Sequence, residues 1–269
     1  MHKSIRTRIW VGTVTFLAVV AFFYPFVVPP EKTSDTDTPE QSEQTTVPNF
    51  AQYTRIVDKK KAFFDYLKPE VEKQNHAILL NRSRLLSIQH AHLASEKAAS
   101  MPDSDIQFVL KLCAEYQVDC ASEDTTYISD KSYQALLLRV DIIPSELVLV
   151  QAANESAWGT SRFAQQGYNF FGLWCFRKGC GFVPRRRNED SHHEVAKFNS
   201  LPHGVARYLN NLNRHPAYAE LRQIRATLRH TQQPITAEPL IEGLLSYSER
   251  GQAYIEELQA MVRVNRKYM

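Results

Sequence analysis

The first hydrophobic run in the chain is too long for an ordinary core helix. Residues 9–28 carry no charge, and Lys3, Arg6 and Arg8 precede them. Twenty helical residues span about 30 Å, the hydrocarbon thickness of a bilayer. Because positively charged flanks stay on the cytoplasmic side, the pattern predicts a signal anchor over residues 1–28 that exports the rest of the chain. The run ends in aromatic rather than small residues, which favours an uncleaved anchor over a removed signal peptide.

The hydrophobic pattern then disappears. Residues 29–48 consist largely of Thr, Ser, Asp, Glu, Gln and Pro, with almost no large apolar residue before Val47. Such a composition does not bury enough apolar surface to fold, so it predicts a flexible linker. A linker of this kind holds the folded part of the chain near the membrane and lets it reach outward.

Helical periodicity dominates the region 49–131, which we interpret as a helical extension. Apolar residues gather in two groups, 63–67 and 78–88. Pro69 lies between them and is expected either in the first turn of a second helix or in a break between two helices. The further predicted helices cover 106–116, 133–140, 145–158, 204–213, 217–228, 237–247 and 252–265.

Alternation replaces helical periodicity after Gly172. An extended stretch is predicted over 182–187, a polar turn over 188–192 and a returning strand over 194–198. Together these segments predict a small β-hairpin in an otherwise helical region.

Composition narrows the classes of partner. The net charge is only +3, and the basic residues are spread along the chain among nearly as many acidic ones. This distribution gives no indication of a nucleic-acid-binding surface. Weak attraction to an acidic wall polymer is compatible with the slight positive excess.

The cysteines fall into two local pairs. They are Cys113 and Cys120, seven residues apart, and Cys175 and Cys180, five residues apart. An exported chain permits disulfides. Zinc is the competing interpretation, but the spacings differ from those of zinc knuckles and the nearby histidines are adjacent, which hinders joint ligation. We therefore expect two disulfides, no metal and no other cofactor.

The predicted helix 145–158 carries an unusual carboxylate. The helix is almost wholly apolar, and Glu155 lies near its end. An ionised carboxylate is costly to bury, so such a group raises its pKa or finds a partner. A raised pKa suits a general acid, while a capping or bridging role explains the residue equally well. Glu146 needs no such explanation, because it follows the expected N-cap Ser145 in the first turn, where the helix dipole favours negative charge.

The residues around Glu155 resemble a known family. The segment 151–164, with Gln151-Ala-Ala-Asn-Glu-Ser-Ala-Trp-Gly, and the segment Tyr168-Asn-Phe-Phe-Gly172 are similar to the signature of glycoside hydrolase family 73, the bacterial N-acetylglucosaminidases. The cysteine-bearing stretch 173–181 and the helices upstream look most like the Bax-type branch of that family in Gram-negative bacteria. The resemblance covers about residues 132–265.

This resemblance implies a fold and a set of site residues. The fold would be mainly α and lysozyme-like, an α+β arrangement in which a helical lobe and the hairpin flank a groove, with a catalytic domain over 132–269. Glu155 would donate a proton to the glycosidic oxygen, and Tyr247 would line the groove and assist catalysis. The substrate-binding residues would be Tyr168, Asn169, Phe171 and, as a sugar platform, Trp174. Packing into the core explains the tyrosine and the turn residues almost as well.

A glycosidase normally needs a second carboxylate. The family places it on the first strand of the hairpin, where this sequence has none. The available acids are Glu189 and Asp190 in the turn and Glu194 on the returning strand. We choose Glu194, because the strand fixes its orientation whereas turn carboxylates are usually solvated. If none serves, the acetamido group of the substrate would take this role, or the protein would not hydrolyse.

These expectations combine into one functional hypothesis with two alternatives. The protein would be a β-N-acetylglucosaminidase that cleaves β-1,4 bonds in the glycan strands of peptidoglycan. It would be a single-pass protein of the inner membrane, held there by its N-terminal helix, with a periplasmic catalytic domain. The alternatives are a lytic transglycosylase or muramidase that uses Glu155 alone, and a non-catalytic wall-binding protein.

Overall fold

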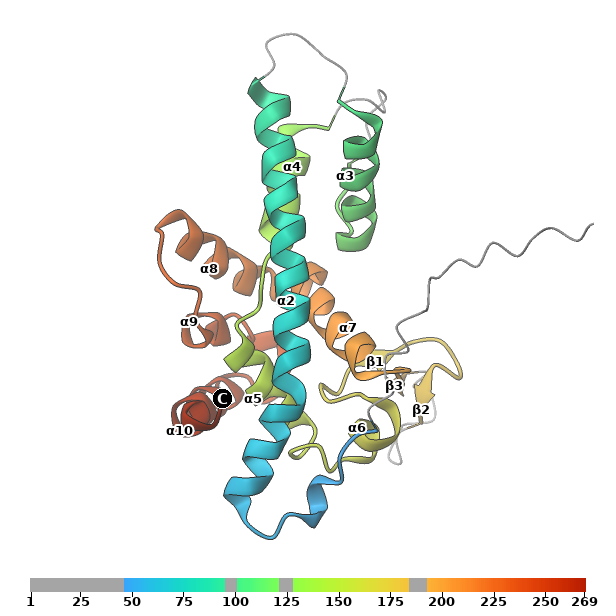
Figure 1. Ribbon diagram of the computed structural model, residues 1–269, viewed down its shortest axis with the longest axis vertical. Coiled ribbons are helices and arrows are strands. Elements are labelled where there is room, and N and C mark those ends of the chain that lie inside the picture. Colours follow the sequence, from blue (N-terminus) through green and yellow to red (C-terminus); the bar gives the residue numbers. More distant parts are fainter. Residues whose placement is uncertain (1–45, 95–100, 121–127, 184–192) are drawn as a thin grey trace, which may run out of the picture. The chain divides into compact units, whose positions relative to one another are not determined.

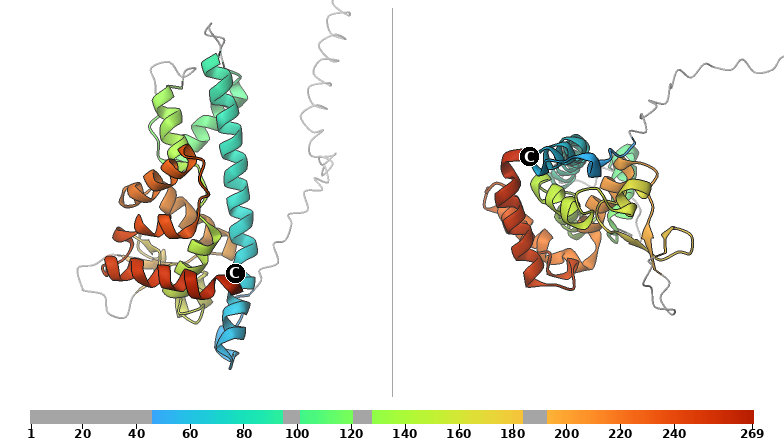
Figure 2. Two further views of the ribbon diagram at one scale, coloured as in Figure 1. Left: turned by 90° about the vertical axis from the view of Figure 1, so that its left-hand side faces the viewer. Right: turned by 90° about the horizontal axis from the view of Figure 1, so that it is seen from below.

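One long helix, α2 (Ile56–Ala94), forms the spine along which the other helices pack (Figures 1 and 2). This computed structural model describes residues 46–94, 101–120, 128–183 and 193–269. The residues from Thr46 to Met269 form one compact unit. Within the described ranges, no helix combines the length and apolar character that a bilayer span requires. The predicted anchor and most of the predicted linker lie outside these ranges.

Pro69 lies inside α2, and the helix continues through it. Both expected positions, a first turn and a break, are therefore wrong. A proline in a helix interior costs roughly 3 kcal/mol, because one backbone hydrogen bond is lost and the ring crowds the preceding turn. Burial on the same helix offsets this cost, since Phe63, Phe64, Leu67 and Val71 are all at most 1% exposed. Each such side chain contributes about 1.5–3 kcal/mol.

The other elements confirm the expected mainly α fold. In chain order they are η1 (Phe50–Gln52), α3 (Asp103–Tyr116), α4 (Asp130–Arg139), α5 (Ser145–Glu155), α6 (Arg162–Gly167), β1 (Trp174–Cys175), β2 (Gly181–Phe182), β3 (Glu194–Ala196), α7 (Leu201–Arg214), η2 (Pro216–Tyr218), α8 (Ala219–His230), α9 (Ala237–Glu242), η3 (Leu245–Tyr247), α10 (Gln252–Asn265) and η4 (Arg266–Tyr268). The predicted helix 237–247 is divided: α9 ends at Glu242, and the Gly243 that follows packs tightly against the backbone of Leu221 in α8.

The expected hairpin is part of a three-stranded antiparallel sheet with the order β1–β3–β2. The pairing of β2 with β3 confirms the hairpin, while β1 is an additional strand that the sequence pattern did not indicate. The returning strand is shorter than the predicted 194–198, while residues 184–187 of the first predicted strand and the predicted turn 188–192 lie outside the described residues.

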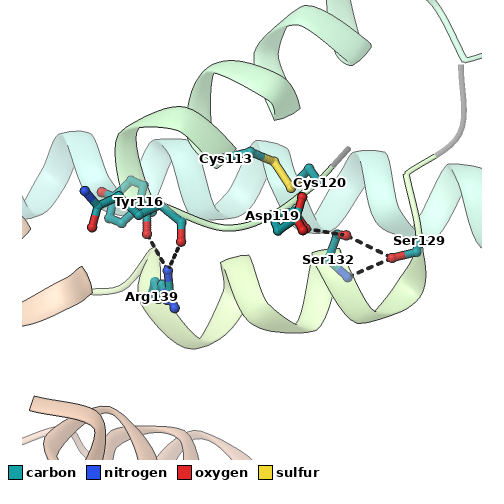
Figure 3. Close-up of a disulfide and its surroundings, with 8 residues drawn as sticks. Cys113, Tyr116, Asp119, Cys120, Ser129, Ser132 and Arg139 are labelled. Atoms are coloured by element: carbon teal, nitrogen blue, oxygen red, sulfur yellow. Dashed lines mark hydrogen bonds between the residues drawn. A yellow bond between two sulfur atoms is a disulfide. The ribbon is translucent and has the colours of Figure 1, made fainter. Parts of the chain in front are cut away.

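Both predicted disulfides are present. Cys113 and Cys120 join the end of α3 to the segment that follows it, and Cys175 and Cys180 close the loop between β1 and β2. Figure 3 shows the first of these bonds and, near Tyr116 at the end of α3, Arg139 of α4. The guanidinium of Arg139 donates hydrogen bonds to the carbonyl oxygens of Tyr116 and Gln117, at 2.6 and 2.5 Å. The disulfide and this arginine together fix the end of α3 against α4.

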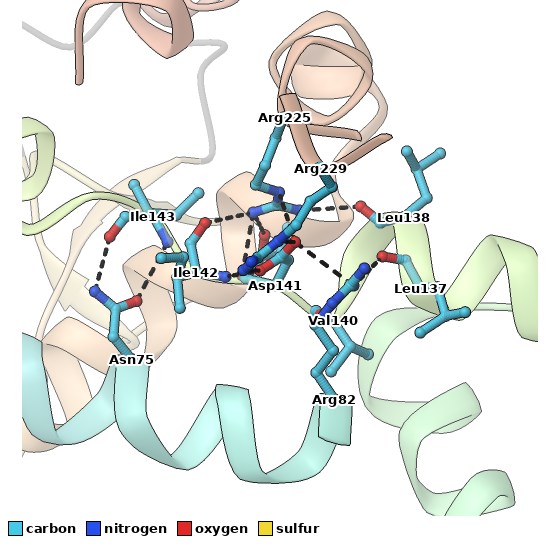
Figure 4. A network of polar contacts seen from close by, with 11 residues as sticks. Asn75, Arg82, Leu137, Leu138, Val140, Asp141, Ile142, Ile143, Arg225 and Arg229 are labelled. Atoms are coloured by element: carbon cyan, nitrogen blue, oxygen red, sulfur yellow. Dashed lines mark hydrogen bonds and ion pairs between the residues drawn. The ribbon is translucent and has the colours of Figure 1, made fainter. Parts of the chain in front are cut away.

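The turn that leads into α5 is held by helices on two sides (Figure 4). Asn75 of α2 exchanges two hydrogen bonds with the backbone of Ile143. The carboxylate of Asp141 pairs with Arg229 of α8 at 2.7 Å and with Arg82 of α2 at 3.5 Å. These contacts fix the turn before α5 from two sides. The expected N-cap Ser145 is in fact the first residue of α5, and Pro144 occupies the capping position without a side-chain hydrogen bond.

Candidate active site

Helix α5 ends at Glu155, three residues earlier than predicted, because the backbone turns sharply there. Ala157, Trp158 and Gly159 all have positive φ, between 51° and 74°. Ser156 holds this turn: its hydroxyl donates to the carbonyl of Ala152 at 2.6 Å and accepts the amide of Gly159 at 2.7 Å. The turn fixes Glu155 as the last helical residue, half-buried at the edge of the core.

A directed chain of hydrogen bonds leads to the Glu155 carboxylate. The hydroxyl of Tyr208 donates to Oε1 of Gln151, whose Nε2 donates to the hydroxyl of Tyr254 at 2.9 Å. The hydroxyl of Tyr254 in turn donates to Oε1 of Glu155 at 2.9 Å. Since Tyr254 already accepts a hydrogen bond from the amide, its own proton points to the carboxylate.

The surroundings of Glu155 favour its protonated form. Burial raises the pKa of this carboxyl above its ordinary value, and the hydrogen bond from Tyr254 only partly opposes that effect. The negative charge of Glu257 raises the pKa further, while Arg250 lowers it. Arg250 and Glu257 form an ion pair at 2.6 Å, so their effects on the pKa of Glu155 oppose each other. A carboxyl of this kind is suited to donate a proton near neutral pH.

A turn from Tyr168 to Gly172 lies behind the carboxylate. Gly172 has a φ of +66°, and a Cβ atom there would lie 3.6 Å from Oε2 of Glu155. Asn169 is buried and holds the turn: its amide nitrogen donates to the carbonyls of Leu173 and Ala196, both at 2.8 Å. The turn thus links the acid to β3.

Tyr247 packs beside this group without bonding to the carboxylate in this structure. Its ring stacks on that of Tyr254 with centroids 5.7 Å apart, and its hydroxyl donates to the carbonyl of Phe171 at 2.9 Å. The ring of Phe171 stacks on Tyr208 at 3.9 Å. The predicted residues Tyr247, Phe171 and Asn169 therefore meet at the acid, where they support the turn.

Glu194 lies in the sheet and is almost completely buried. Its two carboxylate oxygens accept the amides of Gly179, at 2.9 Å, and Gly181, at 2.8 Å. It therefore holds the loop that the Cys175–Cys180 disulfide closes. Although its carboxylate and the two sulfur atoms lie within 4.8 Å of one another, the disulfide removes both thiolates as metal ligands.

Comparison with known proteins places the chain in a family. A protein-family profile described as mannosyl-glycoprotein endo-beta-N-acetylglucosaminidase (Glucosaminidase) matches residues 130–267. The chain belongs to this glucosaminidase family. It is also 34% identical over 227 residues to the protein named "Protein bax" of Escherichia coli (strain K12), a match that covers 84% of this chain and 77% of that protein. No solved structure shows a significant match.

Membership of the glucosaminidase family indicates a glycan-hydrolase type of protein. In such a protein, exposed aromatic residues are candidates for sugar contact. Trp174 is 56% exposed and stacks on His193, with ring centroids 3.9 Å apart. Tyr168 is half-buried at the end of α6. Their contact with a sugar, like the second-carboxylate role of Glu194, stays a prediction. Glu189 and Asp190 lie outside the described residues.

The direct partner of the acid, Tyr254, is not indicated by the sequence pattern. Tyr254 is on α10, about a hundred residues from Glu155, and its role could not follow from local pattern. A partial signal existed in Gln151, the second polar residue on the apolar face of α5, one helical turn before Glu155. A polar residue in that register predicts a buried partner, which is the Tyr254 hydroxyl.

Proposed function

We propose that the protein is a β-N-acetylglucosaminidase that cleaves β-1,4 bonds in peptidoglycan, with Glu155 as the general acid. The observation that carries the proposal is the environment of this carboxyl, which ends a buried helix, has a raised pKa and accepts one hydrogen bond from a tyrosine. Family membership supports a glycan substrate. A lysozyme-like groove between the helices and the sheet is part of the proposal.

The hydrogen-bond pattern suggests which oxygen carries the reactive proton. Oε1 of Glu155 accepts the Tyr254 hydroxyl, so the acid proton resides on Oε2. Oε2 lies beside Gly172, where a Cβ atom would be 3.6 Å from it. In the reaction, this proton moves to the glycosidic oxygen as its bond to the sugar carbon breaks, and positive charge develops on the sugar ring. The carboxylate that remains is stabilised by Tyr254.

Two reactions are candidates for the step that follows bond cleavage. In a hydrolase, either Glu194 or the acetamido group of the substrate assists the attack of water on the sugar ring. A lytic transglycosylase is the second candidate function, because Glu194 already accepts two backbone amides and a transglycosylase needs only Glu155. In that reaction the 6-hydroxyl of muramic acid attacks in place of water.

We also propose the location given by the sequence pattern, a single span in the inner membrane with the folded unit in the periplasm. Two disulfides support an oxidising compartment. The long polar segment after the apolar run would then connect the span to the folded unit.

Mass spectrometry of digested peptidoglycan tests the proposal. The full-length chain and its Glu155→Gln variant are incubated with purified peptidoglycan, and the new glycan ends are identified. Reducing N-acetylglucosamine ends that disappear in the variant are the expected result. Anhydromuramic ends would move the assignment to the transglycosylase, and products that persist in the variant would remove Glu155 from the mechanism. An absence of products from both proteins would point to wall binding.

A further inference from the structure

A pocket of about 500 Å³ is lined by residues of α2, α5 and α10 and of the turn after α5. Trp158 and Met261, together with small alanine side chains, form its apolar lining. Lys60, Asn154 and Glu257 supply polar groups at its edge. Asn154 directly precedes Glu155 on α5, and Glu257 lies one turn after Tyr254 on α10. The pocket lining therefore includes the residue before the proposed acid and a residue one turn from the acid's hydrogen-bond partner.

The charges in this pocket are not balanced. Glu257 is neutralised by Arg250 at 2.6 Å and also accepts the Asn154 amide at 3.4 Å. Lys60 forms no ion pair with a carboxylate of the described residues. Its ammonium is instead held by Oδ1 of Asn265 at 2.8 Å and lies 5.0 Å from the centre of the Trp158 ring. Among the described residues, the lining thus presents a cation, Lys60, that pairs with no carboxylate.

The polar groups of the pocket that are not fully paired among the described residues indicate the chemistry of its ligand. A fixed ammonium binds a single anionic group, and a carboxylate is the usual partner of lysine in proteins. The side-chain oxygen of Asn154 accepts no hydrogen bond from the described residues, so it is open to a peptide N–H. The apolar walls suit short aliphatic side chains. Glu257, close by, disfavours a polyanion.

We propose that this pocket binds the stem peptide of the wall glycan, with a peptide carboxylate on Lys60. The idea rests on the proposed function, because a glycan strand bound at Glu155 carries such peptides on its muramic acid residues. The pocket would then select strands that still have their peptides. Specificity would come from α2, a helix outside the matched family region 130–267.

Binding to matched probes tests this role. Wall tetrasaccharides with stem peptides are prepared in two forms, one with free peptide carboxylates and one with those carboxylates converted to amides. Calorimetry measures the affinity of the full-length Glu155→Gln protein for each form. We expect the carboxylate form to bind about tenfold more tightly, the usual effect of one charge-assisted hydrogen bond.

Substitutions of Lys60 assign the preference to the pocket. Lys60→Met should reduce the tenfold preference to about one, and Lys60→Arg should retain most of it. Lys61→Met is the matched control, because Lys61 is exposed on the same helix and the charge change is identical. Its preference should equal that of the parent protein.

A second variant tests the pocket without changing Lys60, so its result does not depend on whether Lys60 supports folding. Val264 lines the pocket and is 59% exposed, so Val264→Glu adds a repelling charge at little structural cost. It should also abolish the preference. Equal affinity for both probes in the parent protein, or a preference that survives Lys60→Met and Val264→Glu, would overturn the inference. Cleavage is measured separately, so a cleaving protein without this preference refutes the pocket alone, and a selective binder without cleavage refutes the proposed enzyme alone.

Discussion

Two carboxylates lie at opposite ends of helix α5, and their partners leave them with pKa shifts of opposite direction. Asp141 lies in the turn before the helix and Glu155 at its end. Burial by itself raises the pKa of both groups. At Asp141 the guanidinium groups of Arg229, Arg225 and Arg82 outweigh burial and hold the pKa below its ordinary value. At Glu155 the main partner is the neutral hydroxyl of Tyr254, and the pKa stays raised.

The comparison shows how one helix separates a structural carboxylate from a reactive one. Asp141 is stable as an anion and ties α2 and α8 to the start of α5. Glu155 is more easily protonated, which suits an acid catalyst. Because the pKa of Asp141 is depressed, its stabilising contribution is present above the ordinary value of 3.8 and is lost as the pH falls through the lower, folded-state pKa.

The largest expected effect comes from Asp141→Asn. This change leaves the buried guanidinium of Arg225, which is 1% exposed, without its anionic partner. Loss of one member of a buried ion-pair group costs about 3–5 kcal/mol. Urea unfolding of the full-length chain near pH 7 should show this loss in the free energy of unfolding.

Asp58→Asn serves as the control for that measurement. Asp58 pairs with Arg55 at 3.6 Å, but both side chains are largely exposed. An exposed pair contributes only about 0–1 kcal/mol. Equal effects of the two substitutions would show that the Asp141 group is no more important to folding than a surface pair.

A smaller effect, on activity, is expected from Tyr254→Phe. This change removes the hydrogen bond that stabilises the Glu155 anion, so the pKa of Glu155 rises further. Because the acid must be protonated, the high-pH limb of kcat/KM should move to higher pH. The peak value should fall roughly tenfold, since the carboxylate formed in the reaction loses its donor.

Tyr247→Phe is the matched comparison. Its hydroxyl bonds to the carbonyl of Phe171 rather than to Glu155, so the limb should stay where it is. A shift in Tyr247→Phe without one in Tyr254→Phe would exchange the roles assigned to the two tyrosines.

The sequence indicated the role of Glu155 better than that of Asp141. Glu155 was identifiable because a charge interrupts an apolar helix, and the cysteine pairs were identifiable from their spacing. The Asp141 group was not, because it joins Arg82, Asp141 and Arg229 across long sequence separations with no local pattern. The predicted helix start or break at Pro69 was wrong for a related reason, because burial along α2 outweighs the local helix-breaking effect of proline. Long-range packing decided what local propensity left open.

The smallest expected effect is on stability, and its sign separates Glu155 from Asp141. The folded-state pKa of Glu155 is raised, so the folded state favours the protonated form. The stability of the parent protein, relative to a variant with a neutral residue here, therefore declines as the pH rises above 4.5 through the folded-state pKa. Glu155→Gln should therefore raise the Tm near pH 7, on the order of 1–3 °C, and leave it unchanged at pH 4. Gln keeps an oxygen that accepts the Tyr254 hydroxyl.

Glu146→Gln gives the opposite sign at the other end of the same helix. Glu146 lies in the first turn of α5, where the helix dipole favours an anion, and it pairs with Arg266 at 3.0 Å. Removing its charge should lower the Tm slightly at pH 7. If Glu155→Gln also lowered the Tm at pH 7, its carboxylate would be a stabilising anion like Asp141, and the assignment of Glu155 as the proton donor would lose its physical basis.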